Sequence, residues 1–403
     1  MRTSLYTFPS DLVDEGVDHV VETMTKLGVD ELTVALAYHR ARDFCPRRRD
    51  GRLVYRDDGV FLDPDPELWA ASRLVPPLQP ELERAAVKAL LSSGVPVSGW
   101  TVFLHNSTLG TAHPEVTMQT AFGDRLRSNL CPAHPDVASY AAALASTVTG
   151  AGVPVVAEAL GFLPFTHGDH HERYFADLPA AERILLGICF CDRCRRGMGS
   201  AGADPDRLAT AVRTHVDAVV AHERPGSPTR LDALCDVVGA DLERAVAARI
   251  AIVTDLVHHV RSAVQRGGGS LIFLDLTGAA LGYDDGRPEG PAAAAQAWQL
   301  GIDPAALAGA VDGYAVLAYV RDPLRFEADV RSYARTLGAH VPLRVVLRPG
   351  PPDSPDAADL TAKLQAAAAC GADAVDFYNY GMAPAAVLAR IGQALSTPVR
   401  PAP

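Results

Sequence analysis

Residues 153–161 of this 403-residue chain read Val-Pro-Val-Val-Ala-Glu-Ala-Leu-Gly. A short apolar run that ends in a polar residue is typical of a strand buried on both faces of a parallel sheet. Because the acid closes the run, we expect Glu158 at the carboxyl end of this strand.

Seven further runs of this kind alternate with longer amphipathic stretches. The expected strands are residues 5–8, 31–38, 97–104, 154–159, 270–276, 313–320, 343–347 and 374–378. Eight strand and helix units predict the α/β class and a single (β/α)8 TIM barrel over residues 1–403, with long loops after strands two, three and four. A doubly wound sheet is the alternative, and it is disfavoured because no GxGxxG turn follows an early strand.

Two connections carry finer signals. The loop after the second strand is expected to hold a hairpin that pairs residues 53–55 with 60–62 around the turn Asp57-Asp58-Gly59. The cap signal Ser10-Asp11 predicts one helix that continues to about Leu27, and residues 231–265 predict another helical region.

Composition and charge exclude several classes of protein. Hydrophobic residues make up 48% of the chain and charged residues 21%, as in ordinary globular proteins. A net charge of -11 offers no basic face to nucleic acid, and we interpret the basic run at 47–49 as a solvated loop. The N-terminal residues lack the layout of a secretory signal, and no apolar stretch could span a bilayer. We therefore expect a cytoplasmic protein with no membrane partner.

Polar and aromatic residues collect at the ends of the expected strands. These ends converge on one face of a barrel, where active sites lie. Glu158 and Asp275 are the candidate catalytic residues. The candidate substrate-binding residues at strand ends are His39, His105, Asn106, Tyr319, Arg348, Tyr378 and Asn379. For Asn106 and Tyr319, a helix cap or a local loop contact is the favoured alternative.

Three of the seven cysteines fall within six residues, as Cys189, Cys191 and Cys194. Thiolates this close can share one tetrahedral metal, and Cys131 is the best candidate for the fourth ligand. A closed four-cysteine site predicts a structural zinc ion in a loop insertion at about residues 159–228. The alternative is chance clustering of buried or redox-active thiols.

Three motifs together resemble the family-42 β-galactosidases, a family of (β/α)8 glycoside hydrolases. They are Cys-Pro-Ala-His-Pro at 131–135, Val-Val-Ala-Glu at 155–158 and Cys-Phe-Cys-Asp-Arg-Cys at 189–194. The resemblance implies that Glu158 is the general acid/base and that the four cysteines bind zinc.

The chain departs from that family at two positions. Ala157 stands where the family has an asparagine, and the strand at 343–348 lacks the carboxylate that serves as the family's nucleophile. These departures argue against a straightforward β-galactosidase. They also leave the second carboxyl group open: Asp275 is the first choice, Asp322 is second although it also resembles a helix start, and Asp376 is expected to pair with an arginine such as Arg348.

Two further groups could serve a sugar ligand. The segment His-Gly-Asp-His-His-Glu at 167–172 predicts substrate binding by His170 and His171, with a catalytic metal or a plain polar loop as alternatives. The rings of Tyr38, Tyr378 and Tyr380 are expected to stack on sugars, and core packing is an equal alternative for Tyr38.

We therefore expect a glycoside hydrolase-like enzyme that acts on a small glycoside or glycosylated metabolite. The alternatives are a metal-dependent sugar isomerase, epimerase or lyase that uses residues 167–172, and a non-catalytic sugar-binding barrel. The expected partner is a small-molecule carbohydrate, nucleic acid is not expected, and a homo-oligomer is compatible with the sequence.

Overall fold

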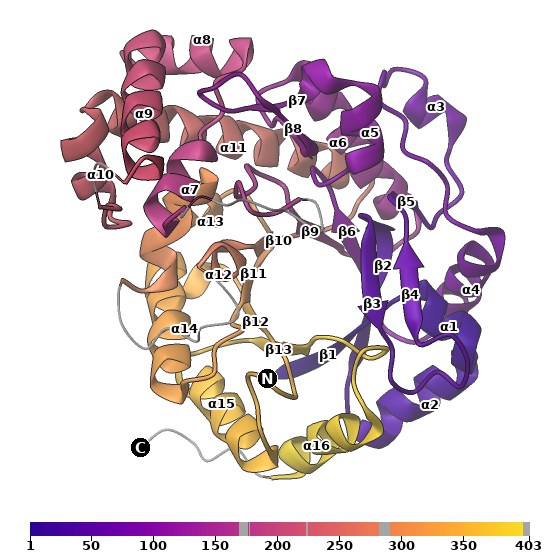
Figure 1. Cartoon of the computed structure of the whole chain (residues 1–403). Helices are drawn as coiled ribbons and strands as arrows, with labels where there is room; N and C mark the ends of the chain where they lie inside the picture. Colours follow the sequence, from indigo (N-terminus) through magenta and orange to yellow (C-terminus); the bar gives the residue numbers. More distant parts are fainter. Residues whose placement is uncertain (169–175, 177, 223–224, 282–290, 398–403) are drawn as a thin grey trace.

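Eight parallel strands close into a barrel in the computed structural model, which describes residues 1–168, 176, 178–222, 225–281 and 291–397 (Figure 1). The barrel strands are β1 (Arg2–Thr7), β2 (Glu31–Tyr38), β6 (Val97–Val102), β9 (Val155–Glu158), β10 (Leu271–Asp275), β11 (Gly313–Leu317), β12 (Leu343–Leu347) and β13 (Ala374–Phe377). Each strand pairs with the next in this order, and β13 pairs with β1 to close the ring. The predicted (β/α)8 barrel is confirmed.

Helices surround the barrel (Figure 1). They are α1 (Pro9–Glu15), α2 (Val17–Leu27), α3 (Pro66–Trp69), α4 (Glu81–Leu91), α5 (Ser107–Ala112), α6 (Pro135–Gly150), α7 (Ala180–Leu186), α8 (Asp192–Ser200), α9 (Pro205–Val220), α10 (Leu231–Val238), α11 (Asp241–Arg266), α12 (Thr277–Ala280), α13 (Pro304–Ala308), α14 (Pro323–Leu337), α15 (Ala357–Ala369) and α16 (Ala385–Ser396), with short 3-10 turns at η1 (Pro114–Val116), η2 (Ala293–Leu300) and η3 (Gly338–His340). Two expected helices are each divided in two, because Gly16 and Gly239 adopt φ angles of 84° and 93°. Such angles suit glycine and interrupt a right-handed helix.

The hairpin expected after the second strand has a different pairing. Strand β4 (Leu53–Arg56) pairs with β3 (Ala41–Phe44), whereas β5 (Gly59–Val60) runs antiparallel to the end of β2. The carboxylate of Asp58 explains the difference, because it accepts hydrogen bonds from the backbone N–H groups of Arg40 and Thr108 at 3.0 and 2.9 Å. The turn signal at 57–59 therefore anchors the chain to neighbouring loops. A second small hairpin joins β7 (Thr117–Gln119) to β8 (Arg125–Leu130).

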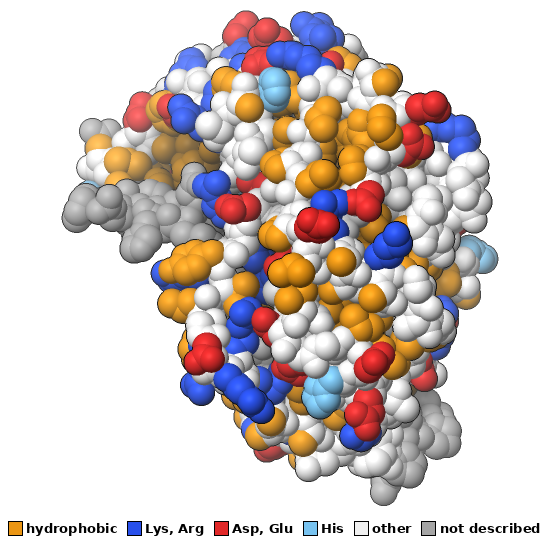
Figure 2. Space-filling view, turned by 90° about the vertical axis from the view of Figure 1, so that its right-hand side faces the viewer, with side chains coloured by type: hydrophobic (Ala, Val, Ile, Leu, Met, Phe, Trp, Pro, Cys, Tyr) orange, Lys and Arg blue, Asp and Glu red, His pale blue; other side chains and the backbone are white. Residues whose placement is uncertain are grey.

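Two hydrophobic cores are formed. One fills the barrel and the layer between its strands and helices, and the other lies among α7, α8, α9, α10 and the first half of α11. On the face shown in Figure 2, hydrophobic side chains lie in groups separated by charged and other polar ones, as is typical of a surface in contact with water. Within the described residues, no helix is long and apolar enough to cross a membrane.

Candidate active site and metal centre

Side-chain alternation along the strands decides which residues face the barrel interior. Residues in register on neighbouring parallel strands point to the same side of the sheet. Glu158 is in register with Leu274 of β10, and both line the same cavity. One residue further along β10, Asp275 therefore points to the opposite side.

The lower interior of the barrel holds a buried ion cluster. Arg344 donates to both carboxylate oxygens of Asp376, at 3.0 and 2.9 Å, and lies 3.5 Å from Glu31. Asp376 thus pairs with an arginine as expected, but with Arg344 and not with Arg348. The charges of this cluster are paired with one another, and the cluster lies in the barrel interior below the cavity.

The cavity has a volume of about 620 Å³ and lies at the carboxyl ends of the strands. Its aromatic lining residues are Tyr6, Tyr38, Trp100, Tyr319 and Tyr378, and its polar ones are His39, Glu158, His167, Arg348 and Asn379. Among the described lining residues, Glu158 is the one carboxylate. An apolar pocket with a few convergent polar groups is typical of small-molecule sites.

Glu158 occupies the end of β9 and remains partly exposed to the cavity. Burial raises the pKa of its carboxyl group to about 7, although a hydrogen bond from Trp100 Nε1, 2.5 Å from Oε2, opposes the shift. A carboxylic acid with this pKa can both give and take a proton near neutral pH. The next residue, Ala159, adopts a φ of 55°, and such strained non-glycine positions concentrate at functional sites.

Three tyrosines, Tyr6, Tyr38 and Tyr378, line the cavity together with the acid. The hydroxyl of Tyr6, in a side chain 1% exposed, has no hydrogen-bond partner among the described residues. Burial and the carboxylate of Asp376 raise the pKa of Tyr6 well above its usual value. Tyr6 is therefore a neutral phenol that can donate a hydrogen bond to a ligand.

The loop after β13 presents Asn379 to the cavity. Asn379 Oδ1 accepts a hydrogen bond from Gly381 N at 3.0 Å, whereas the buried Nδ2 has no partner within the described part of the chain. Tyr380 is buried outside the cavity lining, and its hydroxyl donates to Glu15 at 2.5 Å. Of the three tyrosines expected to stack on a sugar, only Tyr38 and Tyr378 thus line the cavity.

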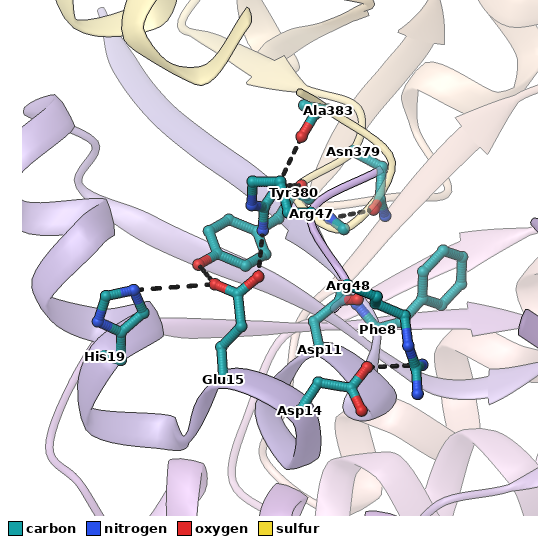
Figure 3. Close-up of polar contacts among 11 residues, drawn as sticks. Phe8, Asp11, Asp14, Glu15, His19, Arg47, Arg48, Asn379, Tyr380 and Ala383 are labelled. Atoms are coloured by element: carbon teal, nitrogen blue, oxygen red, sulfur yellow. Dashed lines mark hydrogen bonds and ion pairs between the residues drawn. The ribbon is translucent and has the colours of Figure 1, made fainter. Parts of the chain in front are cut away.

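Arg47 holds this loop in place (Figure 3). Its Nη1 donates to the carbonyl oxygens of Tyr380 and Ala383 at 2.5 and 2.6 Å, and its Nη2 donates to Glu15 at 2.7 Å. Arg48 forms an ion pair with Asp14 at 2.6 Å. The interpretation of 47–49 as a solvated loop is therefore wrong for Arg47 and Arg48, because both have carboxylate partners.

Arg348 directly follows β12, the strand on which the resembled family has its nucleophile. Its guanidinium donates to Asp353 at 2.5 and 2.8 Å and lies 4.8 Å from the ring centre of Tyr319. Both Arg348 and Tyr319 line the cavity. This part of the wall therefore presents a cation and a ring in place of an acid.

Histidines gather at the rim. The rings of His39 and His105 stack with centroids 4.0 Å apart, and His167 lies 4.7 Å from His105. His105 is buried beside the cavity but does not line it. His170 and His171, like Asp169 and Glu172, lie outside the described residues.

Three predicted residues make hydrogen bonds that stabilise the fold. Asp275 is fully buried outside the cavity and accepts hydrogen bonds from Thr277 N, Thr277 Oγ1, Tyr314 Oη and Tyr333 Oη at 2.8, 2.5, 2.6 and 3.0 Å. Asn106 and Asp322 cap α5 and α14, accepting from Leu109 N and Arg325 N at 2.8 and 2.7 Å. The expectation that Asp275 shares the mouth with Glu158 is therefore wrong.

Sequence reasoning missed Tyr6 and Trp100. Both lie inside strands, two and four residues before the expected strand ends that we searched for polar groups. The alternation of side chains along the strands was the signal that could have found them.

The four predicted cysteines form a buried cluster. The sulfur of Cys131 lies 3.8, 3.6 and 3.5 Å from those of Cys189, Cys191 and Cys194. Tetrahedral coordination at about 2.3 Å would separate sulfurs by about 3.8 Å, so the four thiols fit one metal ion. Among the described histidines, cysteines and acids, this set is the one group with ligand atoms close enough to share an ion.

These features define a (β/α)8 barrel with a strand-end cavity and a cysteine cluster that could hold a metal. No protein-family model and no curated protein sequence matches the chain. Among solved structures, it is similar to a β-galactosidase from the psychrophilic Marinomonas ef1, with a TM-score of 0.55 and 12% identity over 98% of this chain and 59% of that one. It also matches GH5_18 from Streptomyces cattleya, with a TM-score of 0.48 and 13% identity over 99% of this chain and 82% of that one.

The first of these similarities supports the (β/α)8 barrel fold. The chain spans less than two thirds of the β-galactosidase. The substrate of the β-galactosidase is therefore stated for that protein and not for this chain.

Proposed function

We propose that this protein is a glycoside hydrolase-like enzyme acting on a small glycoside or glycosylated metabolite, with Glu158 as the general acid/base. One observation carries the proposal: a glutamate with a pKa of about 7 lies in the wall of an aromatic cavity at the barrel mouth. In its protonated form, Glu158 would donate a proton to the glycosidic oxygen as the bond to the sugar breaks. Water would then add to the sugar carbon and release a proton that restores the acid.

The surroundings of Glu158 suit a sugar ring. Tyr38 and Tyr378 offer flat faces for stacking. Tyr6 Oη and Asn379 Nδ2 are buried lining groups without a hydrogen-bond partner in the described residues, so they would donate to ligand hydroxyls. In the resembled family, an asparagine takes this role where the chain has Ala157.

Glycoside hydrolysis normally uses two carboxyl groups, and the described cavity lining supplies one. The strand that carries the family's nucleophile has no carboxylate here, and Asp275 is turned away from the cavity. The proposal therefore assigns the proton transfer to Glu158 and assigns no protein nucleophile.

The experiment compares native protein with Glu158→Gln on a panel of aryl glycosides. We expect the substitution to lower kcat/KM by roughly a hundredfold to ten-thousandfold, the usual contribution of a general acid. Glu182→Gln is the matched control, because Glu182 is also buried but contacts His215 at 2.8 Å outside the cavity. Equal activity of native protein and Glu158→Gln would overturn the proposal.

A non-catalytic sugar-binding barrel is the second candidate, favoured by the guanidinium of Arg348 in place of a carboxylate. It predicts that native protein binds sugars and leaves the whole panel intact. The metal-dependent isomerase, epimerase or lyase stays a prediction, because Asp169, His170, His171 and Glu172 lie outside the described residues.

We also propose that Cys131, Cys189, Cys191 and Cys194 bind one structural zinc ion. The support is their burial, their sulfur separations and the preference of Zn²⁺ for thiolates. Bound zinc would join the segment before α6 to the insertion at about 159–228 of a single barrel domain. Metal analysis of purified protein should find one zinc per chain.

A further inference from the structure

A buried arginine lies beside the cysteine cluster without an acidic partner. Arg249 on α11 is 1% exposed, and its Nη1 and Nη2 donate to the carbonyl oxygens of Gly187 and Gln299 at 3.1 and 2.9 Å. Its guanidinium stacks 4.0 Å from the ring centre of Phe162. Within the described part of the chain, no carboxylate forms an ion pair with it.

This charge requires compensation. An arginine side chain does not lose its proton inside a protein. A buried charge without a counter-charge strongly destabilises a fold. Two carbonyl groups and one ring supply only partial negative charge, so a full negative charge is expected nearby.

The cysteine cluster is close to Arg249 in the fold. Gly187, which accepts from Arg249, lies two residues before Cys189. Helices α8 and α11 pack against each other, and α8 carries Cys194 (Figure 1). Burial disfavours the charged form of Arg249 and so lowers its pKa, whereas negative charge on these cysteines would favour the charged form.

We propose that the guanidinium of Arg249 is the counter-charge of a tetrathiolate metal centre and strengthens the binding of a divalent cation by the four cysteines. Four thiolates around a divalent cation leave two negative charges in a buried site, and Arg249 neutralises one of them. The inference rests on the zinc binding proposed above and concerns a residue that is not itself a ligand.

The test measures the affinity of the full chain for Zn²⁺ by competition with a chromogenic chelator. Arg249→Met should weaken zinc binding roughly ten- to a hundredfold, the range found for partners that surround metal ligands. Arg249→Lys keeps a cation but loses the contact with Phe162 and one carbonyl contact, so it should weaken zinc binding less than Arg249→Met does. Arg261→Met is the matched control on the same helix, because Arg261 pairs with Asp312 at 3.0 Å, and it should leave zinc binding unchanged.

The outcomes separate the two proposals. Native zinc affinity in Arg249→Met, or equal losses in the lysine and methionine variants, would overturn the role of Arg249 alone. A native protein that takes up no zinc would overturn the zinc site as well. If Arg249→Met does not fold, Arg249→Gln takes its place, since glutamine keeps a hydrogen-bond donor and removes the charge.

Discussion

Glu158 and Asp275 end neighbouring strands of the barrel and differ in almost everything else. Glu158 has one donor, Trp100 Nε1, and faces a cavity. Asp275 has four donors, lies behind the sheet and is fully buried. Burial raises the pKa of both carboxyl groups, so a shifted pKa alone does not mark a catalytic acid. The difference that matters is access: the carboxyl group of Glu158 faces the cavity, and that of Asp275 does not.

The largest expected effect tests the structural role of Asp275. Asp275→Asn replaces an acceptor with a donor that faces the hydroxyls of Tyr314 and Tyr333. We expect the free energy of unfolding to fall by about 2 to 4 kcal/mol, because buried hydrogen bonds to a charged group are lost. Denaturant unfolding measures the loss, and kcat/KM per folded molecule should stay within about twofold. A large loss of kcat/KM at unchanged stability would show that Asp275 acts in the reaction.

The second effect is a pH-dependent stability difference between native protein and Glu158→Gln. Folded Glu158 keeps its proton up to about pH 7, whereas the unfolded chain releases it near 4.5. Native stability should therefore fall as the pH rises from about 4.5 to 7. Glutamine does not titrate, so Glu158→Gln should match native protein at pH 4 and exceed it by about 3 kcal/mol at pH 8. A difference that does not change with pH would contradict the raised pKa.

The contrast between these two acids also shows how far sequence reasoning reached. Short apolar runs such as residues 343–347 correctly predicted the strands, because their apolar character reflects burial on both faces of the sheet. The close spacing of Cys189, Cys191 and Cys194 likewise indicated the cluster, because residues this near in sequence are also near in space. The choice of Asp275 failed because a strand-end position does not reveal which way a side chain points. That depends on register with neighbouring strands, which are distant in the sequence.

A smaller effect concerns the one donor to Glu158. The hydrogen bond from Trp100 lowers the pKa of Glu158, so Trp100→Phe should raise it, by roughly half a unit to one unit. Activity that requires protonated Glu158 should then persist to higher pH. The pH profile of kcat/KM measures this shift, and an acidic displacement of its alkaline limb would contradict it.

The smallest effect separates binding from stability at Tyr6. Tyr6→Phe removes a buried hydroxyl without a hydrogen-bond partner in the described residues, so the free energy of unfolding should stay constant or rise by up to about 1 kcal/mol. The KM for an active aryl glycoside should increase. Thermal unfolding and steady-state kinetics measure the two changes, and a loss of stability with unchanged KM would make Tyr6 a purely structural residue.

The decisive measurement is a carbon-NMR titration of Glu158 in protein with labelled glutamate side chains, assigned by the signal that disappears in Glu158→Gln. A buried acid ready to donate a proton at the barrel mouth should titrate near pH 7. Titration at about pH 4 to 5, as for an ordinary exposed glutamate, would contradict Glu158 as the general acid.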